Sequence, residues 1–350
     1  DQLDHTAPAV AGTAVENTLT IDFGAVLVAK DGDGDSVPLT GLVNVNVTDD
    51  IPELIANAAP VAVTVDEDDI DTSTSLGTQP NDGNEKDGSF TGTAGVDNGG
   101  PANVTSTAGS LQSLVRVGAD EKVSFSLISI AEMRTYLEGL DLFSNKSEVG
   151  FDLRTDGTII GFVNAAGGAV PGQTYDSNEG DRLVFKFILN GDGTFKFELY
   201  DQLDHTAPAV AGTAVENTLT IDFGSVIQVT DSDGDSVALE GLVKVNVTDD
   251  IPVIAPNAKP ISIKVDEDDI DTATSLGNAP NDGDNPDGSF TGTPGVNTGG
   301  PANATSTVSL ASLVKVGADE NVSFSLINQT DMRAYLEGLK LTSNGAPLGY

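Results

Sequence analysis

The stretch DQLDHTAPAVAGTAVENTLTIDFG, residues 1–24, occurs a second time without any change as residues 201–224. The similarity continues to the C-terminus with a period of 200 residues and one deletion, so that Tyr350 corresponds to Phe151. The 350-residue chain therefore holds one full period and most of a second. Repetition of this kind is typical of proteins that stack one structural unit many times. We expect the chain to be a window cut from a longer tandem array, with arbitrary ends.

Two connectors containing Pro, Asn and Ala interrupt the strand-like pattern of each repeat. They are IPELIANAAP at residues 51–60 and IPVIAPNAKP at residues 251–260. Short connectors that contain proline stiffen a joint between domains. We therefore predict that residues 1–52 are the C-terminal part of one repeat, residues 53–252 are one complete repeat, and residues 253–350 are the N-terminal part of the next.

Alternation of apolar and polar residues dominates the rest of the sequence, which predicts half-buried antiparallel strands. Glycine-rich turns at residues 154–158 and 190–194 are expected to join neighbouring strands as hairpins. The predicted fold class is all-β, with tandem immunoglobulin-like β-sandwich domains that are stabilised by calcium. One sandwich or two smaller ones would fit each repeat. The clearest alternating runs are Leu19/Ile21/Phe23, Val43/Val45/Val47, Val61/Val63/Val65, Val123/Phe125/Leu127 and Phe195/Phe197/Leu199.

One short helix is predicted in each repeat. Ser129 has the type and position of an N-cap, with Glu132 three residues later, and Gly139 is expected to end the helix. Ile130, Met133 and Leu137 would form its apolar stripe, a pattern whose counterpart in the second copy begins at Asn328.

The composition excludes several classes of protein. The chain has 54 acidic and 16 basic residues, a net charge of −38 and no cysteine. Nucleic-acid phosphates and anionic membranes repel such a surface, and the chain has no disulfide, thiolate metal site or Cys nucleophile. No apolar stretch approaches the roughly 20 residues that a membrane span needs, so this segment is not expected to insert into a membrane. Because so much charge opposes folding, we expect the fold to depend on bound cations.

The strongest chemical signal is KDGDGDS at residues 30–36, with TDSDGDS at residues 230–236 as its repeat. Ca²⁺ prefers about six to eight oxygen ligands, and alternating Asp residues in a turn can direct several carboxylates toward one point. The loop is not an EF-hand, because Ser36 and Leu42 stand where Gly and Glu are required. The alternative is that Asp and Gly merely form a solvated turn.

Further acidic clusters flank the connectors. One cluster ends the strand before each connector, and the other follows the strand after it. Many carboxylates are therefore expected near one joint. Like charges held close together are costly unless a cation lies among them. Fainter clusters occur at residues 81–88 and 281–288. We predict several Ca²⁺ ions per repeat. The predicted ligands are Asp31, Asp33, Asp35, Asp49, Asp50, Asp66, Glu67, Asp68 and Asp69, with Asp231, Asp233, Asp235, Asp249, Asp250, Asp266, Glu267, Asp268 and Asp269 in the second copy.

Nothing in the sequence indicates an enzyme. His5 and His205 occupy equivalent positions of the two copies, each beside an Asp, as expected for a hydrogen-bonded structural residue. No nucleophile elbow or catalytic triad is present. The 5% share of aromatic residues and the absence of Trp argue against a surface that stacks on carbohydrate rings, although a sugar bridged by calcium would remain compatible.

The succession DGTFKFELYDQLDH, NTLTIDFG, DSDGDSV and VNVTDDIP resembles the tandem repeats of giant repeats-in-toxin (RTX) adhesins, which Gram-negative bacteria export by type I secretion. The resemblance covers the full period. It implies an extracellular, calcium-bound extender on the cell surface that projects a binding tip for adhesion or biofilm formation. Its partners would be neighbouring repeats of the same chain and, in a fibre, other copies. The resemblance assigns calcium to Asp231, Asp233 and Asp235 and to their copies.

Two other functions remain compatible with the sequence. One is a module that binds a glycan or protein through calcium. The other is a subunit of a self-assembling filament or surface layer, with joints between chains instead of within one.

Overall fold

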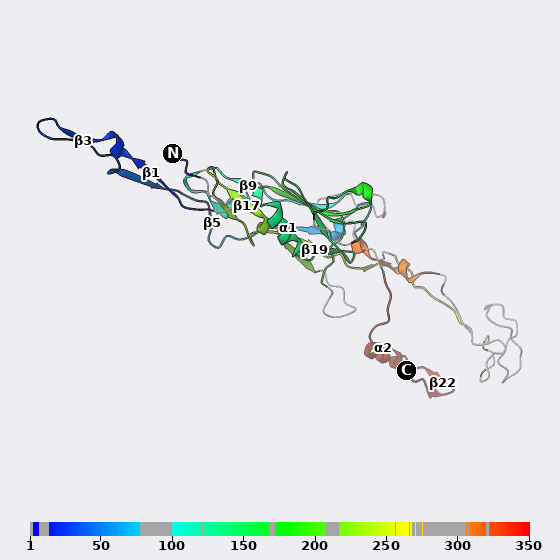
Figure 1. Cartoon of the computed structure of the whole chain (residues 1–350). Coiled ribbons are helices and arrows are strands. Elements are labelled where there is room, and N and C mark those ends of the chain that lie inside the picture. The colour runs from blue at the N-terminus through cyan, green and yellow to red at the C-terminus, as the bar shows by residue number, and fades with distance from the viewer. Residues whose placement is uncertain are drawn as a thin grey trace. The chain divides into compact units, whose positions relative to one another are not determined.

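The structure is a computed structural model, and it divides into two compact units (Figure 1). The first contains Asp1–Ile251 with Gly317–Glu320, and the second contains Pro252–Val316 with Asn321–Tyr350. The repeat boundaries expected near residues 52 and 252 remain a prediction, although one unit boundary lies at Ile251/Pro252. The described residues are 3–6, 14–77, 100–120, 122–167, 172–206, 217–255, 257–265, 267, 270, 275, 306, 308–319 and 322–350.

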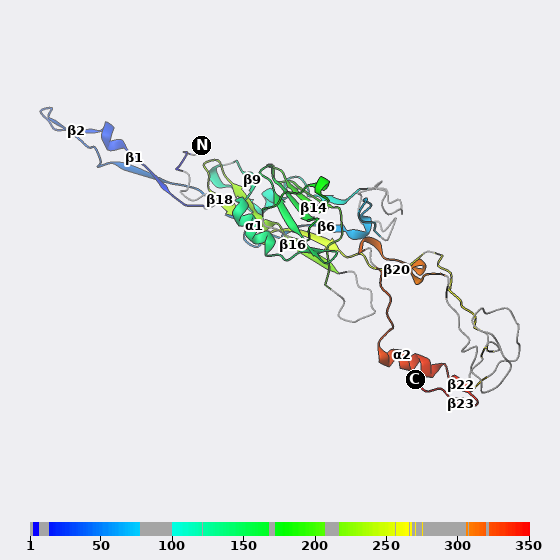
Figure 2. The same cartoon turned by 45° about the vertical axis from the view of Figure 1, so that its right-hand side comes forward.

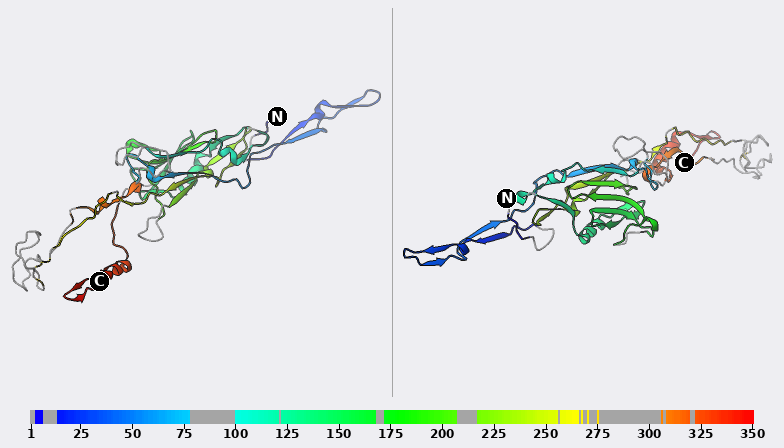
Figure 3. Two further views of the ribbon diagram at one scale, coloured as in Figure 1. Left: turned by 180° about the vertical axis from the view of Figure 1, so that it is seen from behind. Right: turned by 90° about the horizontal axis from the view of Figure 1, so that it is seen from above.

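Strands dominate the first unit, and the described residues of the whole chain form only two α-helices, so the protein is all-β in class. The largest sheet has five antiparallel strands in the order β12-β13-β14-β15-β7. Figure 3 shows strands of this sheet in green from two directions. The turns at residues 154–158 and 190–194 join β12 to β13 and β14 to β15, as predicted. The strand bounds are β7 Ala102–Thr105, β12 Gly150–Leu153, β13 Thr158–Val163, β14 Arg182–Leu189 and β15 Phe195–Leu199.

Two three-stranded sheets complete the first unit, in the orders β16-β19-β6 and β18-β17-β9. The prediction that all strands pair antiparallel is wrong for one pair, because β6 runs parallel to β19 with Val63 opposite Val245. The two strands are far apart in sequence, so no short hairpin turn fixes their direction. The bounds are β6 Val61–Asp66, β9 Ser124–Leu127, β16 Thr218–Asp222, β17 Ile227–Thr230, β18 Ser236–Ala238 and β19 Val243–Thr248.

The remaining elements are short. Two-stranded ladders are β1 (Thr18–Asp22) with β4 (Asn44–Thr48), β2 (Val28–Lys30) with β3 (Ser36–Pro38), β5 (Glu53–Leu54) with β8 (Val115–Arg116), β10 (Phe143–Ser144) with β11 (Ser147–Glu148), β20 (Val253–Ile254) with β21 (Val314–Lys315), and β22 (Thr342–Ser343) with β23 (Ala346–Pro347). Short 3₁₀ turns are η1 Phe23–Val26, η2 Glu67–Asp69, η3 Leu111–Leu114, η4 Gly118–Asp120, η5 Ser177–Glu179, η6 Gly224–Val226, η8 Leu310–Leu313 and η9 Gly317–Asp319.

The predicted helix is confirmed as α1 (Ile130–Glu138), which lies among the strands of the first unit (Figure 2). The Ser129 hydroxyl accepts a hydrogen bond from the Glu132 N–H and donates one to the Glu132 carboxylate. Gly139 is the C-cap, as expected. Met133 and Leu137 are buried, whereas Ile130 is 41% exposed, so the apolar stripe is shorter than predicted. The second copy, α2 (Gln329–Gly338), is capped by Asn328.

The core of the first unit is centred on phenylalanine side chains drawn from several elements. The fully buried Phe223 ring stacks on Phe187 with 4.1 Å between ring centroids, and it meets Phe185 edge to face at 6.2 Å. Phe185 in turn stacks on Phe197 of the neighbouring strand. Stacked and edge-to-face pairs add to the stabilisation that comes from burying these large rings. All three sheets contribute to one hydrophobic cluster.

The repeated sequence gives the same local structure in two different environments. Leu19 of β1 pairs with Val47 of β4, and Leu219 of β16 pairs with Val247 of β19, in identical register. However, β19 has β6 as a second neighbour, whereas the β1–β4 ladder has only two strands. Consequently Phe23 is 45% exposed, while its counterpart in the second copy is completely buried.

This difference predicts that Phe223→Ala lowers the free energy of unfolding by about 3–5 kcal/mol, because it leaves a cavity beside three aromatic rings. The matched control is Phe23→Ala, at the same position of the other copy, where we expect a change of about 0.5 kcal/mol or less. Denaturant unfolding followed by circular dichroism measures both. Equal effects of the two substitutions would contradict the assignment of the core.

Candidate metal centre

The Asp-x-Asp-x-Asp stretches form the tight loops of the β2–β3 and β17–β18 hairpins. In each loop the first Asp folds the backbone around its own carboxylate. One oxygen of Asp231 accepts hydrogen bonds from the N–H groups of Gly234 and Asp235, and Asp31 does the same in the first copy. Gly234 has a φ of 111°, a region that favours glycine. The loop therefore turns sharply, and the carboxylate of its first Asp is used to hold the turn.

The two loops differ in burial, and the pKa of their first Asp differs with it. The carboxylates of the first loop are exposed, and a hydrogen bond with the Asp33 side chain lowers the pKa of Asp31. In the second loop Asp235 is fully buried, and burial raises the pKa of Asp231 to about 7. The first Asp of the loop thus has a lowered pKa in one copy and a raised pKa in the other.

The first buried cluster consists of Asp49, Asp233 and Asp235, whose ligand atoms all lie within 4.8 Å of one another. The Val15 N–H donates to one oxygen of Asp235 at 2.6 Å, and the His5 N–H donates to one oxygen of Asp233 at 3.3 Å. The second oxygen of each of these two carboxylates is buried without a hydrogen-bond partner. Burial and the neighbouring charge of Asp233 raise the pKa of Asp49. We call this set the loop cluster.

The second buried cluster consists of Glu67, His205 and Asp249, again within 4.8 Å. Glu67 is completely buried; its Oε1 accepts the Leu203 N–H at 2.7 Å and lies 3.4 Å from His205 Nε2. Its Oε2 and both ring nitrogens of His205 make no hydrogen bond. Burial raises the pKa of Glu67 well above its ordinary value and lowers the pKa of His205. We call this set the strand-end cluster.

Asp319 of η9 adds a further carboxyl group to the surroundings of the strand-end cluster. Burial, together with the charges of Glu67, Asp249 and Asp250, raises the pKa of Asp319 to about 7. The adjacent Ala318 N–H donates to Asp250 at 2.8 Å, which anchors η9 at this place. Buried carboxylates with like charges and unpartnered oxygens are the donor set that a cation would neutralise.

The predicted ligands are thus distributed unevenly. Asp49, Asp233 and Asp235 meet in the loop cluster and Glu67 and Asp249 meet in the strand-end cluster, while Asp31, Asp33 and Asp35 form an exposed cluster of their own. Asp231 shapes its loop, and Asp50 and Asp250 bind backbone N–H groups. Asp66 caps η2, which contains Asp68 and Asp69, and Glu267 is exposed. Asp266, Asp268, Asp269 and the loops at residues 81–88 and 281–288 lie outside the described residues.

The sequence did not indicate His5, His205 or Asp319 as members of these centres. A single His beside an Asp is typical of a hydrogen-bonded structural residue, whereas both ring nitrogens of His205 are buried without a hydrogen-bond partner. A cluster formed by residues 67, 205 and 249 becomes visible only when the pairing of β6 with β19 brings their ends together.

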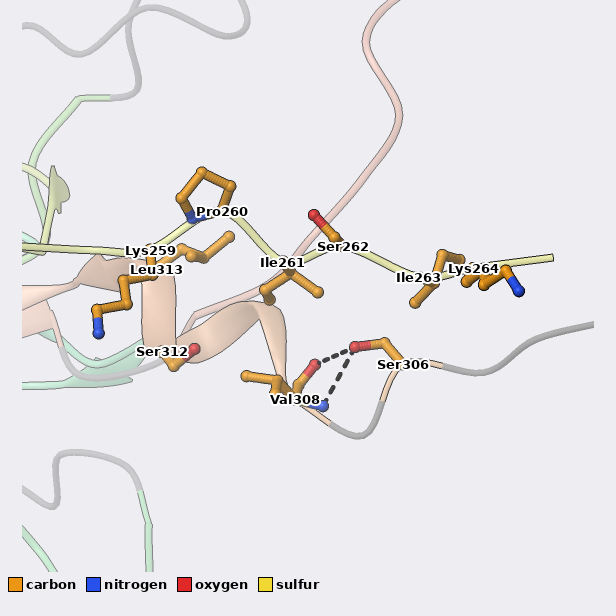
Figure 4. A pocket seen from close by; sticks show the side chains of 10 residues that line it. All are labelled: Lys259, Pro260, Ile261, Ser262, Ile263, Lys264, Ser306, Val308, Ser312 and Leu313. Atoms are coloured by element: carbon orange, nitrogen blue, oxygen red, sulfur yellow. Dashed lines mark hydrogen bonds between the residues drawn. The ribbon is translucent and has the colours of Figure 1, made fainter. Parts of the chain in front are cut away.

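A pocket of about 590 Å³ in the second unit has no acidic lining residue (Figure 4). Ile261 and Ile263 line one side and Leu313 the other. The corresponding stretch of the first unit is strand β6, which is paired with β19. The pocket therefore corresponds to a strand edge that is covered in the first unit, and it offers no charged group for chemistry apart from two lysines.

Comparison of the chain with protein-family models, with curated proteins and with solved structures found no match. Within the described part of the chain, neither helix is long and apolar enough to cross a membrane.

The raised pKa values predict how the stability of the metal-free protein depends on pH. Asp231 and Asp319 titrate near pH 7 in the folded state and near an ordinary 3.8 when unfolded. Between these values the native state holds more protons than the unfolded state, so stability falls as pH rises from about 4 to 7. We expect a higher melting temperature in EDTA at pH 5 than at pH 7.5.

Asp231→Asn should reduce this pH dependence, because it removes one of the groups that titrate near pH 7. Asp31→Asn is the matched control in the exposed loop and should leave the dependence unchanged. A melting temperature that rises steadily from pH 5 to pH 7.5 in EDTA would contradict the prediction.

Proposed function

We propose that this chain is a structural extender of a long secreted bacterial adhesin or surface fibre, stiffened by calcium. The observation that carries the proposal is the presence of two buried carboxylate clusters with unpartnered oxygens in a chain built from 200-residue repeats. None of the described pockets is lined by a residue of either cluster. Their chemistry suits the binding of a cation that holds segments together.

Calcium is the cation that this donor set favours. Carboxylate oxygens are hard ligands, and Ca²⁺ accepts the flexible geometry of several carboxylates at once. Two ionised carboxylates about 4.8 Å apart repel by on the order of 3 kcal/mol at an effective dielectric constant of about 20. A bound divalent ion replaces this repulsion by attraction, so the ion would stabilise the folded joint directly.

The setting in which such a switch is useful is export to the outside of the cell. Calcium is scarce in the cytosol, so the charged segments would remain unfolded there. Millimolar calcium outside the cell would bind them and stabilise their folded state. A chain without cysteine can cross a secretion channel unfolded without becoming cross-linked. These considerations support an RTX adhesin repeat at the cell surface, in adhesion or biofilm formation.

The arrangement of the sheets supports the finer part of the fold assignment. Inward-facing side chains of all three sheets of the first unit share one hydrophobic cluster, as the two faces of a sandwich do. We propose that each repeat is an immunoglobulin-like β-sandwich with one short helix, and that the acidic loops lie at its ends.

Calcium should therefore raise the melting temperature of the chain above its value in EDTA, and Mg²⁺ at equal ionic strength should not. An ion present at a hundredfold excess over its dissociation constant contributes about 2.7 kcal/mol. For a domain of about 200 residues this corresponds to roughly 5–10 °C for each tightly bound ion. Thermal melts followed by circular dichroism measure the shift. An unchanged melt would mean that the carboxylates are only a solvated surface.

Removing the buried loop carboxylates should reduce the calcium-dependent shift. We expect the double variant Asp233→Asn/Asp235→Asn to lose at least 5 °C of it, because these side chains supply unpartnered buried oxygens. The matched control Asp33→Asn/Asp35→Asn changes the same positions of the exposed copy and should lose less. A larger loss in the control would show that burial does not select the site.

Stiffening should also be visible in solution scattering. We expect small-angle X-ray scattering of the chain to show a narrower distribution of dimensions in millimolar calcium than in EDTA. If calcium raised the melting temperature without changing the scattering, the ions would stabilise each domain and the extender function would lose its support.

A further inference from the structure

The two buried clusters use corresponding residues of the two copies. Asp49 of the loop cluster and Asp249 of the strand-end cluster are the same residue of the repeat, and so are His5 and His205. Their companions differ, because Asp49 lies with Asp233 and Asp235 whereas Asp249 lies with Glu67. One carboxylate of the repeat therefore has two different sets of neighbours.

A second contact shows that both clusters lie at the same kind of junction. Asp50 accepts a hydrogen bond from the Ala119 N–H at 2.7 Å, and Asp250 accepts one from the Ala318 N–H at 2.8 Å. Because the second copy carries one deletion, Ala119 and Ala318 are corresponding residues. The end of one repeat thus meets the same 3₁₀ turn of the following repeat in both cases.

Each of the two junctions in this chain has only some of the acidic residues that a junction between two complete repeats would have. At the loop cluster the following repeat contributes Asp233 and Asp235, but no residue of the chain corresponds to Glu67 of the preceding repeat. At the strand-end cluster Glu67 is present, but no residue corresponds to Asp233 and Asp235 of the following repeat. Because Asp49 and Asp249 are the same residue of the repeat, a junction that had both sets would place them around one carboxylate.

We propose that each junction between consecutive repeats holds one cation site that the two repeats share. Glu67 and Asp249 come from the preceding repeat, and the residues equivalent to Asp233 and Asp235 come from the acidic loop of the following repeat. The inference rests on the proposed function in taking Ca²⁺ as the ion. It adds that the loop cluster and the strand-end cluster are two halves of one centre.

The ligand count favours the shared centre over two separate ones. In the loop cluster one oxygen each of Asp233 and Asp235 is occupied by a backbone N–H, and in the strand-end cluster Glu67 Oε1 is occupied in the same way. Each half alone therefore falls short of the six to eight oxygens, approximately, that Ca²⁺ prefers. Glu67 and Asp235 are fully buried and each keeps one unpartnered oxygen, so both halves direct an unused donor into the junction.

The test uses the chain extended after Tyr350 by a copy of residues 152–252, which continues the repeat in register because Tyr350 corresponds to Phe151. In this extended chain the second junction has both halves. Isothermal titration with CaCl₂ gives the number of tightly bound ions. One variant is Glu67→Gln, which keeps the shape of the side chain, and the other changes the appended copies of Asp233 and Asp235 to Asn.

We expect each variant to lose the same single ion, so that the combined variant loses one ion and not two. Asp33→Asn/Asp35→Asn in the exposed first loop is the control and should leave this ion in place. A loss of two ions in the combined variant would overturn the shared site, as would retention of the ion in either variant. Asp→Asn keeps the size and shape of the side chain, so the loop variant keeps the test valid even if Glu67→Gln failed to fold.

The proposed function and this inference fail in distinguishable ways. If the extended chain bound no calcium, both would be wrong. If calcium bound and raised the melting temperature, but the two variants lost separate ions, the extender would stand and the shared site would be rejected.

Discussion

Repulsion among buried carboxylates is the constraint on which the ends of this fold depend. The core around Phe223 consists of apolar rings and needs no counter-charge. The strand ends and the acidic loop are different, because there Glu67 lies close to Asp249 in one cluster and Asp235 lies close to Asp49 in the other, with Glu67 and Asp235 fully buried. Burial of like charges raises their proton affinity and destabilises the ionised form. The sheets are thus stable through packing, whereas at their ends either protons or a bound cation would relieve the repulsion between carboxylates.

The two copies of the repeat show which structural features follow from local sequence and which depend on the segments packed around it. Local sequence is sufficient for the hairpin loop, since Asp31 and Asp231 accept the same two backbone hydrogen bonds. It is not sufficient for burial, because Phe23 is exposed where Phe223 is enclosed. The pKa of the first Asp of each loop follows burial and not sequence, as it is lowered in one copy and raised in the other. The chemistry of the acidic motif is therefore decided by what packs against it.

The same distinction explains what could be predicted. The cap at Ser129, the stop at Gly139 and the glycine turns depend on residues within a few positions, and the sequence was enough to locate them. The parallel pairing of β6 with β19 depends on contacts between distant segments, and it was missed. His205 was missed for the same reason, because its partners Glu67 and Asp249 are distant in sequence. The alternating Asp residues located the acidic loop correctly, but they could not show which of its two copies is buried.

A tandem array with apolar cores and charged junctions divides stability into two terms that respond to different conditions. In repeat proteins the total stability is approximately a sum of intrinsic repeat terms and nearest-neighbour junction terms. Calcium bound at the proposed sites would change the junction term while leaving the packing of Phe187 and Phe223 untouched. Stiffness would then follow the calcium concentration without any refolding of the sheets. Near identity of successive copies is consistent with this division, because every junction must offer the same carboxylates to the next repeat.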